Sequence, residues 1–361
     1  MTEKYKYSEK DIKILTLDES MRQRPQMYFG KLTNRGFIYN LKVILQDVYE
    51  LSQANLISIE LIETHSVKIR FENFKRSIEK KWIDYQGLEL YKIPSNYLFL
   101  FELQAFKALS TDFIIRSKDF KQVYKDGKLI KNTETTDLID GWLEVEFTLD
   151  RQFWKDFEFN TDYIHQEIRD FAFLNKNIKF KLNYFTDNEE NKITYHFKNG
   201  LKDKVNNELL NGHGGSDLQM EVELKQEQFE LEAAFAFREY DIDEPILKSY
   251  VNKAYTPEDG THVEAVLKGI TYGIMAYLQK HELTGNHRIS EQSVRKNIIL
   301  FLNVQFFNID MQMFKYRTKY KLDNVGIIEP ISTHISKLVF EKLESDKEIA
   351  EKIIKKFRIY E

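Results

Sequence analysis

GFIYNLKVILQDVYELSQAN (36–55), ISIELIE (57–63) and SVKIRFEN (66–73) form the stretch that decides how the first half of the chain folds. In the first segment, apolar residues recur at the three- and four-residue spacing of a helix with one buried face. In the other two, apolar and polar residues alternate, which predicts two strands joined around Thr64 and His65. The chain therefore begins its core with a long helix followed by a hairpin, a pattern typical of an α+β domain.

Helix and strand patterns continue outward from this stretch. In the first half we expect a buried helix over 98–109, strands within 113–131 closed by an Asp126-Gly127 turn, a strand over 143–149, a helix over 161–175 and a strand over 178–185. In the second half we expect two alternating strands, a helix over 262–280, a strand over 298–307 and two closing helices, the last with a capping box from Ser345 to Glu348. The small-residue cluster NGHGGS (211–216) predicts a boundary between a domain of residues 1–215 and one of residues 216–361.

Composition excludes several classes of protein. The 361 residues contain no cysteine, which rules out a disulfide scaffold, thiol catalysis and cysteine-ligated zinc. No apolar run reaches the roughly 18 residues of a membrane span, so we expect a cytoplasmic protein without membrane contact. The net charge of −4 gives no global attraction to nucleic acid and leaves a local basic patch possible. Glycine is scarce, with 14 residues, and Gly87 is the only glycine between Phe37 and Asp126.

Four short strings carry a resemblance to a known family. They are RQRPQMYFG (22–30), IRDFAFLNKNIKFKL (168–182), SYVNKAYTPEDGTHVEAVLKGIT (249–271) and FKYRTKYKLDN (314–324). In order and spacing they resemble the N-terminal ATPase and transducer segments of the DNA gyrase and topoisomerase IV B subunits, members of the GHKL superfamily. The resemblance implies an α+β fold: a GHKL-type ATPase-like α/β sandwich, then a transducer domain with a four-stranded sheet and a ribosomal-protein-S5-like fold. It also implies that the chain ends about where the family's TOPRIM domain would begin, so that alone it would neither cleave nor pass DNA.

The resemblance places Val43 and Asp47 at two positions of the ATP site. In the family, a glutamate general base and an asparagine metal ligand stand one helical turn apart on the first long helix. Val43 occupies the glutamate position, and valine cannot accept a proton. Asp47 occupies the asparagine position and could ligate magnesium if Mg-ATP binds, the alternative being an ordinary solvated aspartate.

The family's adenine-binding aspartate and its glycines are also replaced. The resemblance puts Phe71 at the aspartate position, followed by Glu72 and Asn73 where a glycine-rich string would stand. A one-residue slip would bring Glu72 to the aspartate position, but the alternation of Val67, Ile69 and Phe71 opposes a slip. We expect Phe71 to fill the former adenine site, or to be an ordinary core residue. The lid glycines are replaced by Phe and Leu within NYLFLFELQAFKALS (96–110).

One catalytic element is partly retained. In the family, a Gln-Thr-Lys loop of the transducer domain reaches the terminal phosphate, and here the loop is Arg317-Thr318-Lys319. Lys319 could meet an anion, or it could be one lysine of a solvated basic run. The candidate remnants of a cofactor site are Asp47, Glu72, Asn73, Thr318 and Lys319. The eight histidines show no metal-ligand spacing.

Three hypotheses about function follow. The first is a catalytically silent relative of the B-subunit ATPase segment, with no cofactor, which dimerises or modulates a topoisomerase. Its N-terminal arm keeps the anchors Tyr5, Tyr7, Ile12 and Ile14, so the expected partner is a second copy or a gyrase- or topoisomerase IV-type subunit. The second is a divergent, Mg-ATP-dependent ATPase in which Asp47, Glu50 or Glu72 takes over lost roles beside a separate cleavage subunit. The third is a clamp that holds DNA in a basic cavity between transducer domains.

Overall fold

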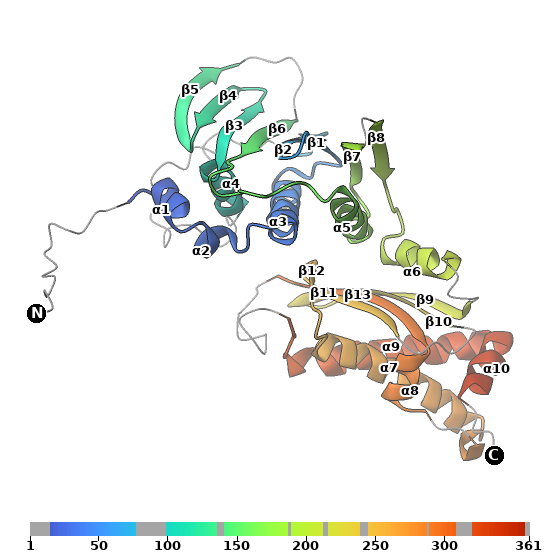
Figure 1. The fold of residues 1–361 in the computed structure, drawn as a ribbon. Coiled ribbons are helices and arrows are strands. Elements are labelled where there is room, and N and C mark those ends of the chain that lie inside the picture. Colours follow the sequence, from blue (N-terminus) through green and yellow to red (C-terminus); the bar gives the residue numbers. More distant parts are fainter. Residues whose placement is uncertain are drawn as a thin grey trace, which may run out of the picture. The chain divides into compact units, whose positions relative to one another are not determined.

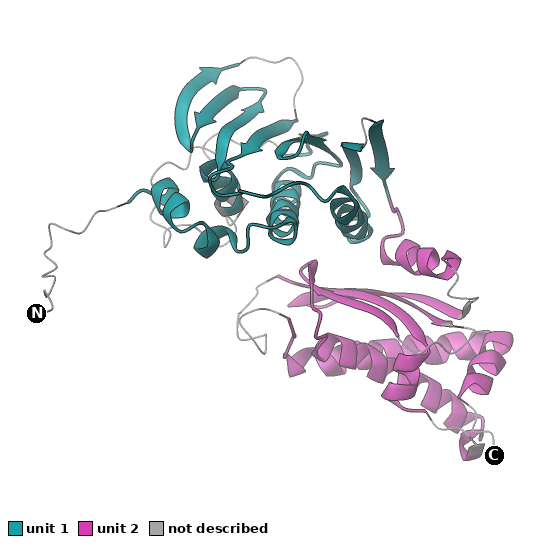
Figure 2. Ribbon diagram, viewed as in Figure 1, with its two compact units in different colours: residues 1–196 teal, residues 197–361 magenta. Residues whose placement is uncertain are grey.

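The computed structural model describes residues 15–76, 99–135, 141–186, 189–211, 216–238, 245–286, 289–307 and 320–357. These residues form two compact units, residues 1–196 and residues 197–361, which Figure 2 colours separately. Each unit mixes helices with one sheet, which confirms the predicted α+β class. No described helix combines the length and the apolar character that a bilayer crossing requires.

The first unit is built on an eight-stranded sheet of order β5-β4-β3-β6-β2-β1-β7-β8. Its strands are β1 (Leu56–Ile62), β2 (Ser66–Glu72), β3 (Ser110–Ser117), β4 (Phe120–Lys125), β5 (Lys128–Glu134), β6 (Leu143–Leu149), β7 (Lys179–Thr186) and β8 (Glu189–Tyr195). Its helices are α1 (Leu17–Gln23), α2 (Pro25–Phe29), α3 (Asn34–Ser52), α4 (Phe99–Ala108) and α5 (Thr161–Phe173). The helices lie along one face of the sheet, as Figure 1 shows, so the central strands have one covered and one uncovered face, whereas the edge strands β5 and β8 are largely exposed.

The hairpin predicted from the sequence is present and in the expected phase. β1 and β2 pair antiparallel with Ile57 opposite Phe71, and β1 also pairs parallel with β7. Both strands of the hairpin alternate between half-buried and buried side chains, with Val67, Ile69 and Phe71 on the buried face. Helix α3 covers this face with its apolar stripe, and Leu41, Ile44, Leu45 and Val48 are buried in the core. Thr33 caps the start of the helix.

The second unit is built on a five-stranded sheet of order β12-β11-β13-β10-β9. Its strands are β9 (Ser216–Lys225), β10 (Phe229–Arg238), β11 (Ile246–Val251), β12 (Ala254–Tyr255) and β13 (Ile298–Phe306). Its helices are α6 (Leu201–Leu210), α7 (Thr261–Lys280), α8 (Glu291–Lys296), α9 (Ile328–Ser345) and α10 (Lys347–Lys356), with short 3-10 turns at Thr284–Asn286 and Val325–Ile327. The central strand β13 is buried along almost its whole length, which explains its continuous apolar run.

Three details differ from the sequence expectations. The second sheet has five strands because the short β12 adds to β11, where four strands were expected. The predicted capping box of the last helix is wrong: the cap is Asp346, whose side chain accepts from the backbone N–H of Ile349. The compact units divide between His196 and Phe197, so α6 lies with the second unit, where it packs against β10 and β13.

Candidate functional site

Val43 and Asp47 lie one turn apart on α3, on the flank of its buried stripe. Both side chains are half-buried, and Tyr39, a further turn earlier, is more exposed. Helix α4 packs against α3 at this flank. The i, i+4 spacing therefore brings the two predicted positions to one face of the helix, as expected.

A carboxyl group that the sequence analysis missed stands beside Asp47. Glu102 on α4 and Asp47 each have one carboxyl oxygen that is buried and has no hydrogen-bond partner among the described residues. Burial raises the pKa of Asp47 to about 8, with further contributions from the charges of Glu102 and Glu50. Burial also raises the pKa of Glu102 to about 7. Near neutral pH this carboxyl pair carries less than its full negative charge.

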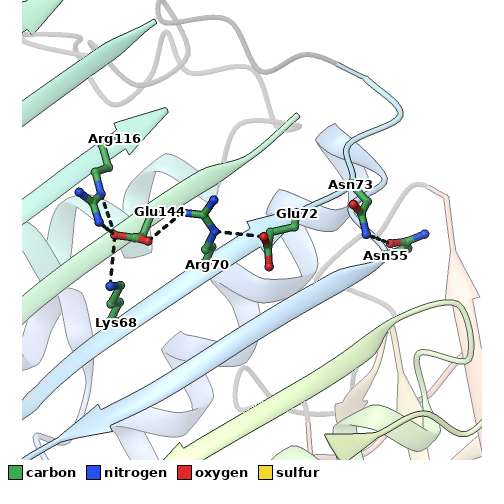
Figure 3. Close-up of polar contacts among 7 residues, drawn as sticks. All are labelled: Asn55, Lys68, Arg70, Glu72, Asn73, Arg116 and Glu144. Atoms are coloured by element: carbon green, nitrogen blue, oxygen red, sulfur yellow. Dashed lines mark hydrogen bonds and ion pairs between the residues drawn. The ribbon is translucent and has the colours of Figure 1, made fainter. Parts of the chain in front are cut away.

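The end of β2 turns Phe71 and Glu72 to opposite faces of the sheet. Phe71 is fully buried on the helix-covered face. Glu72 is on the uncovered face, where its Oε1 lies 3.2 Å from Nε of Arg70 (Figure 3). Because the sheet lies between them, Glu72 does not join Asp47 in one site. The in-phase alternation excludes the one-residue slip that would have moved Glu72 inward.

Asn73 keeps the turn that follows β2 in a glycine-like conformation. Its φ is 59°, in the left-handed region that asparagine tolerates better than most residues. Its side-chain amide donates to Oδ1 of Asn55 at 2.9 Å (Figure 3), and the carbonyl of Ser52 accepts from the next N–H groups at Lys75 and Arg76. The turn is therefore fixed to the end of α3 by the protein's own groups.

On the uncovered face, Glu144 of β6 is surrounded by three cations. Its carboxylate contacts Arg116 of β3, Arg70 of β2 at 3.1 Å and Lys68 of β2 at 3.7 Å (Figure 3). Only 2% of the Glu144 side chain is exposed. The guanidinium of Arg70 also lies 4.6 Å from the ring centroid of Trp142. This cluster ties three neighbouring strands together by charge-assisted hydrogen bonds.

Arg22, from the first matched string, holds the base of the first unit together. Its guanidinium donates to the carbonyl of Ala108 at 2.8 Å and pairs with Asp150 at 2.9 Å, and it lies over the ring of Phe153. Asp18 of the same helix pairs with Lys107 at 3.1 Å. Helix α1 therefore fixes the last turn of α4, which supports a packing role for this motif.

In the second unit, the string around His262 forms an anchored helix start. His262 is fully buried, its Nε2 lies 3.2 Å from Oγ1 of Thr256, and burial lowers its pKa to about 3, so it is a neutral core residue. Asp259, just before Gly260, has a left-handed φ of 57°. Its carboxylate accepts hydrogen bonds from Arg295 at 2.6 Å and from Ser249 at 3.2 Å. A Cβ on Gly260 would lie 2.2 Å from the carbonyl oxygen of Leu322, so the two backbones touch.

Several predicted residues fall outside the described part of the chain. Thr318 and Lys319 lie there, and so do the arm residues Tyr5, Tyr7, Ile12 and Ile14. Their roles stay predictions, as does the basic cavity between transducer domains. The other three predicted cofactor-site residues do not come together. Asn73 contacts Asn55, Glu72 contacts Arg70, and Asp47 lies near Glu102.

The chemistry available at this site is limited. Val43 offers no proton acceptor, and Phe71 offers no hydrogen bond to a purine. Among the described residues, no three histidine or acidic side chains gather as metal ligands. The Asp47 and Glu102 pair could hold a proton between two helices. Among the described residues, Val43 and Phe71 lack the proton acceptor and the purine hydrogen bond that hydrolysis of Mg-ATP, which the fold family implies, would require.

Comparison with known proteins agrees with this fold. The family model for DNA gyrase B matches residues 162–359, more than half of the chain. The topoisomerase 4 B subunit of Borreliella burgdorferi is 26% identical over 97% of this chain and 57% of its own length, and the gyrase B subunit of Archaeoglobus fulgidus is 23% identical over 97% and 58%.

Solved structures give the same result for the fold. The ATP-binding domain of Francisella tularensis topoisomerase IV, with a small-molecule inhibitor, matches at a TM-score of 0.72 and 22% identity over 94% of this chain and 95% of that chain. The 43K ATPase domain of Thermus thermophilus gyrase B, with an aminocoumarin, matches at a TM-score of 0.74 and 18% identity over 94% and 93%. The chain belongs to the DNA gyrase B family. It spans a little under three fifths of the length of the curated relatives that it matches.

Proposed function

We propose that this chain is a catalytically silent, gyrase-B-like module that works through binding to other proteins. The observation that carries the proposal is Phe71, a fully buried aromatic side chain at the position where the resemblance places the adenine-reading carboxylate. An apolar ring at this position removes the hydrogen bond that would select a purine, and a site that loses such a partner discriminates poorly.

Val43 and the loss of glycines support the same proposal. A valine at the base position leaves the attacking water without a proton acceptor, and such losses commonly cost about 100-fold or more in rate. Phe and Leu stand where the family's lid has glycines in the string 96–110, and without glycine a loop lacks the backbone freedom with which it can cradle phosphates. The three losses concern the base, the purine and the phosphates, so no single replacement would restore hydrolysis.

Nucleotide binding is the direct test. Calorimetry with Mg-ATP on the full chain is expected to show no saturable binding below ~100 µM, a limit equivalent to about −5.5 kcal/mol. The variant Val43→Glu separates two cases: it would raise phosphate release only if nucleotide already binds and only the base is missing. Saturable binding by the unmodified chain would overturn the proposal.

A silent module would act as a dimeric or modulating subunit. We propose a homodimer, or a heterodimer with a gyrase- or topoisomerase IV-type subunit, supported by the arm residues Tyr5, Tyr7, Ile12 and Ile14 and by the family's subunit organisation. Light scattering at tens of micromolar should give the mass of a dimer, and alanine at all four arm positions should lower it. A strict monomer that also fails to bind a gyrase-type subunit would contradict this part of the proposal.

The Asp47 and Glu102 pair favours one second candidate, a divergent ATPase that works with a separate cleavage subunit. Carboxyl groups whose pKa values lie near neutrality are common in acid–base sites. Under this candidate Asp47 would hold magnesium, and Glu102, rather than the distant Glu72, would replace the lost base. It predicts measurable phosphate release that Asp47→Asn and Glu102→Gln abolish, whereas Glu72→Gln leaves it unchanged.

A further inference from the structure

The uncovered face of the eight-stranded sheet carries one continuous row of side chains. Register places these residues laterally next to one another on successive strands, one from each. In order from β5 to β8 the row consists of Thr133, Lys121, Arg116, Glu144, Arg70, Ser58, Lys181 and Thr194. We call this set the transverse row.

The transverse row is strongly cationic in a chain that is acidic overall. Four of its members are cations and one, Glu144, is an anion, whereas the whole chain has a net charge of −4. Of the two adjacent rows on the same face, one has Lys131, Lys68 and Lys192 against Glu146 and Glu60, and the other has Lys179 against Glu72. The transverse row is therefore a local concentration of positive charge that the net charge of the chain does not reveal.

Glu144 organises the centre of the row. Arg116 and Arg70 approach its carboxylate from the two neighbouring strands (Figure 3). Both guanidiniums stay partly accessible, with 38% and 33% of their side chains exposed. Arg70 also contacts Glu72 at 3.2 Å. A guanidinium has five N–H donors, so one that carboxylates already hold can still donate to a further oxygen anion. The arginines are thus fixed in place before any ligand arrives, which lowers the entropy cost of binding.

The length and composition of the transverse row indicate which class of ligand it would bind. Lys121 and Lys181 are separated by five interstrand steps, or ~24 Å at ~4.8 Å a step. Cations spread over this length suit a long polyanion. The row contains no apolar or aromatic side chain, and protein partners are usually anchored by such residues. Binding by charge alone, without base readout, is typical of contacts to a nucleic-acid backbone.

We propose that the transverse row binds the phosphate backbone of duplex DNA without base specificity. Every member of the row except Glu144 is half-buried or exposed, and the described helices of this unit lie on the other side of the sheet (Figure 1). The inference does not depend on whether the module hydrolyses ATP, and the nucleotide titration above tests that separately.

Charge reversal at the two ends of the row tests the proposal. Fluorescence anisotropy with a labelled duplex of about 20 base pairs, in two unrelated sequences, should give equal affinities that fall with salt. If all four cations contact phosphates, the slope of log K against log salt is about −3 to −4. Lys121→Glu with Lys181→Glu should weaken binding at least about tenfold at 50 mM salt and reduce the slope by about 2.

Lys155→Glu with Lys198→Glu is the matched control, because both lysines are exposed and lie outside the row. It makes the same change in net charge and should alter the affinity by less than about twofold. Equal thermal melting of all three proteins shows that folding is unchanged. Absence of salt-dependent duplex binding, or an equal loss in the control, would overturn the proposal. The proposal would also be overturned if the protein bound poly-glutamate but not DNA and the Lys121→Glu and Lys181→Glu changes weakened that binding. The ligand of the row would then be an acidic protein.

Discussion

Asp47 on α3 and Glu102 on α4 bring two carboxyl groups together in the contact between these helices, and the pKa of each is raised mainly by burial. No cation or donor among the described residues satisfies the buried oxygens that face this contact. The folded state is therefore most stable when at least one of the two carboxyl groups is protonated. Because the unfolded chain releases such protons near pH 4, the pair links folding to pH.

The sign of this linkage gives the first prediction. Between the ordinary carboxyl pKa and the raised pKa of Asp47, about 8, the folded state binds more protons than the unfolded state, so stability falls as pH rises. Asp47→Asn removes the titrating group and should raise the melting temperature at pH 8 by roughly 2–4 °C, or about 1 kcal/mol, with little effect near pH 4. Circular dichroism melts at both pH values measure it.

Glu50→Gln is the control for this prediction. Glu50 lies on the same helix, is exposed and accepts a hydrogen bond from Gln46. Its effect on the melting temperature at pH 8 should be less than half that of Asp47→Asn. If Asp47→Asn changed stability equally at both pH values, the effect would be one of packing, and the carboxyl pair would not titrate as described.

The close approach of α7 and α9 gives the second prediction. A Cβ on Gly273 would lie 2.7 Å from the carbonyl oxygen of Ser336 and 2.7 Å from Cβ of Val339. Alanine normally stabilises a helix by about 1 kcal/mol relative to glycine. Here overpacking should reverse the sign, and Gly273→Ala should lower the free energy of unfolding by about 1–3 kcal/mol in urea titrations. Gly285→Ala, where a Cβ meets nothing within 4 Å, should be nearly neutral.

The sequence predicts the first unit's centre well because its signals are local. The alternation in β1 and β2 fixes which face each side chain takes, so the burial of Phe71 and the outward direction of Glu72 follow from the pleat. The stripe on α3 likewise locates its core face. By contrast, β8 is largely exposed and α6 is mostly polar. Neither has a strong apolar periodicity, so the sequence does not predict these two elements.

The site itself depends on contacts between distant segments. Glu102 appears in the sequence as one acid in an apolar helix, and its meaning emerges only when α4 packs against α3. The transverse row depends on the register of eight strands, and no local pattern in any of them predicts it. An acidic residue inside an otherwise buried helix was nevertheless a usable signal, because unpaired carboxylates are rarely buried.

The left-handed backbone at Asp259 gives the third prediction. Asp259 has a φ of 57° and pairs with Arg295 at 2.6 Å. Alanine would keep the unfavourable backbone and lose the ion pair, so Asp259→Ala should cost about 1–2 kcal/mol. Asp259→Gly loses the pair but relieves the backbone and should be close to neutral. Urea unfolding of the two variants, with Arg295→Ala as a measure of the ion pair alone, should reproduce this order; equal losses in both would refute the backbone argument.

The last prediction concerns how α1 holds α4. Arg22 donates to Ala108 and pairs with Asp150, whose side chain is only 9% exposed, so truncation leaves a mostly buried carboxylate without its cation. Arg22→Ala should lower the free energy of unfolding by about 2–3 kcal/mol. Arg22→Lys keeps the charge but cannot reach both acceptors as a planar fork, so it should recover only part of the loss. Arg24→Ala, in the same motif but exposed, should change stability by less than about 0.5 kcal/mol. Hydrogen exchange should show faster opening of the α4 amides in Arg22→Ala than in Arg24→Ala, and equal rates would place the role of Arg22 elsewhere.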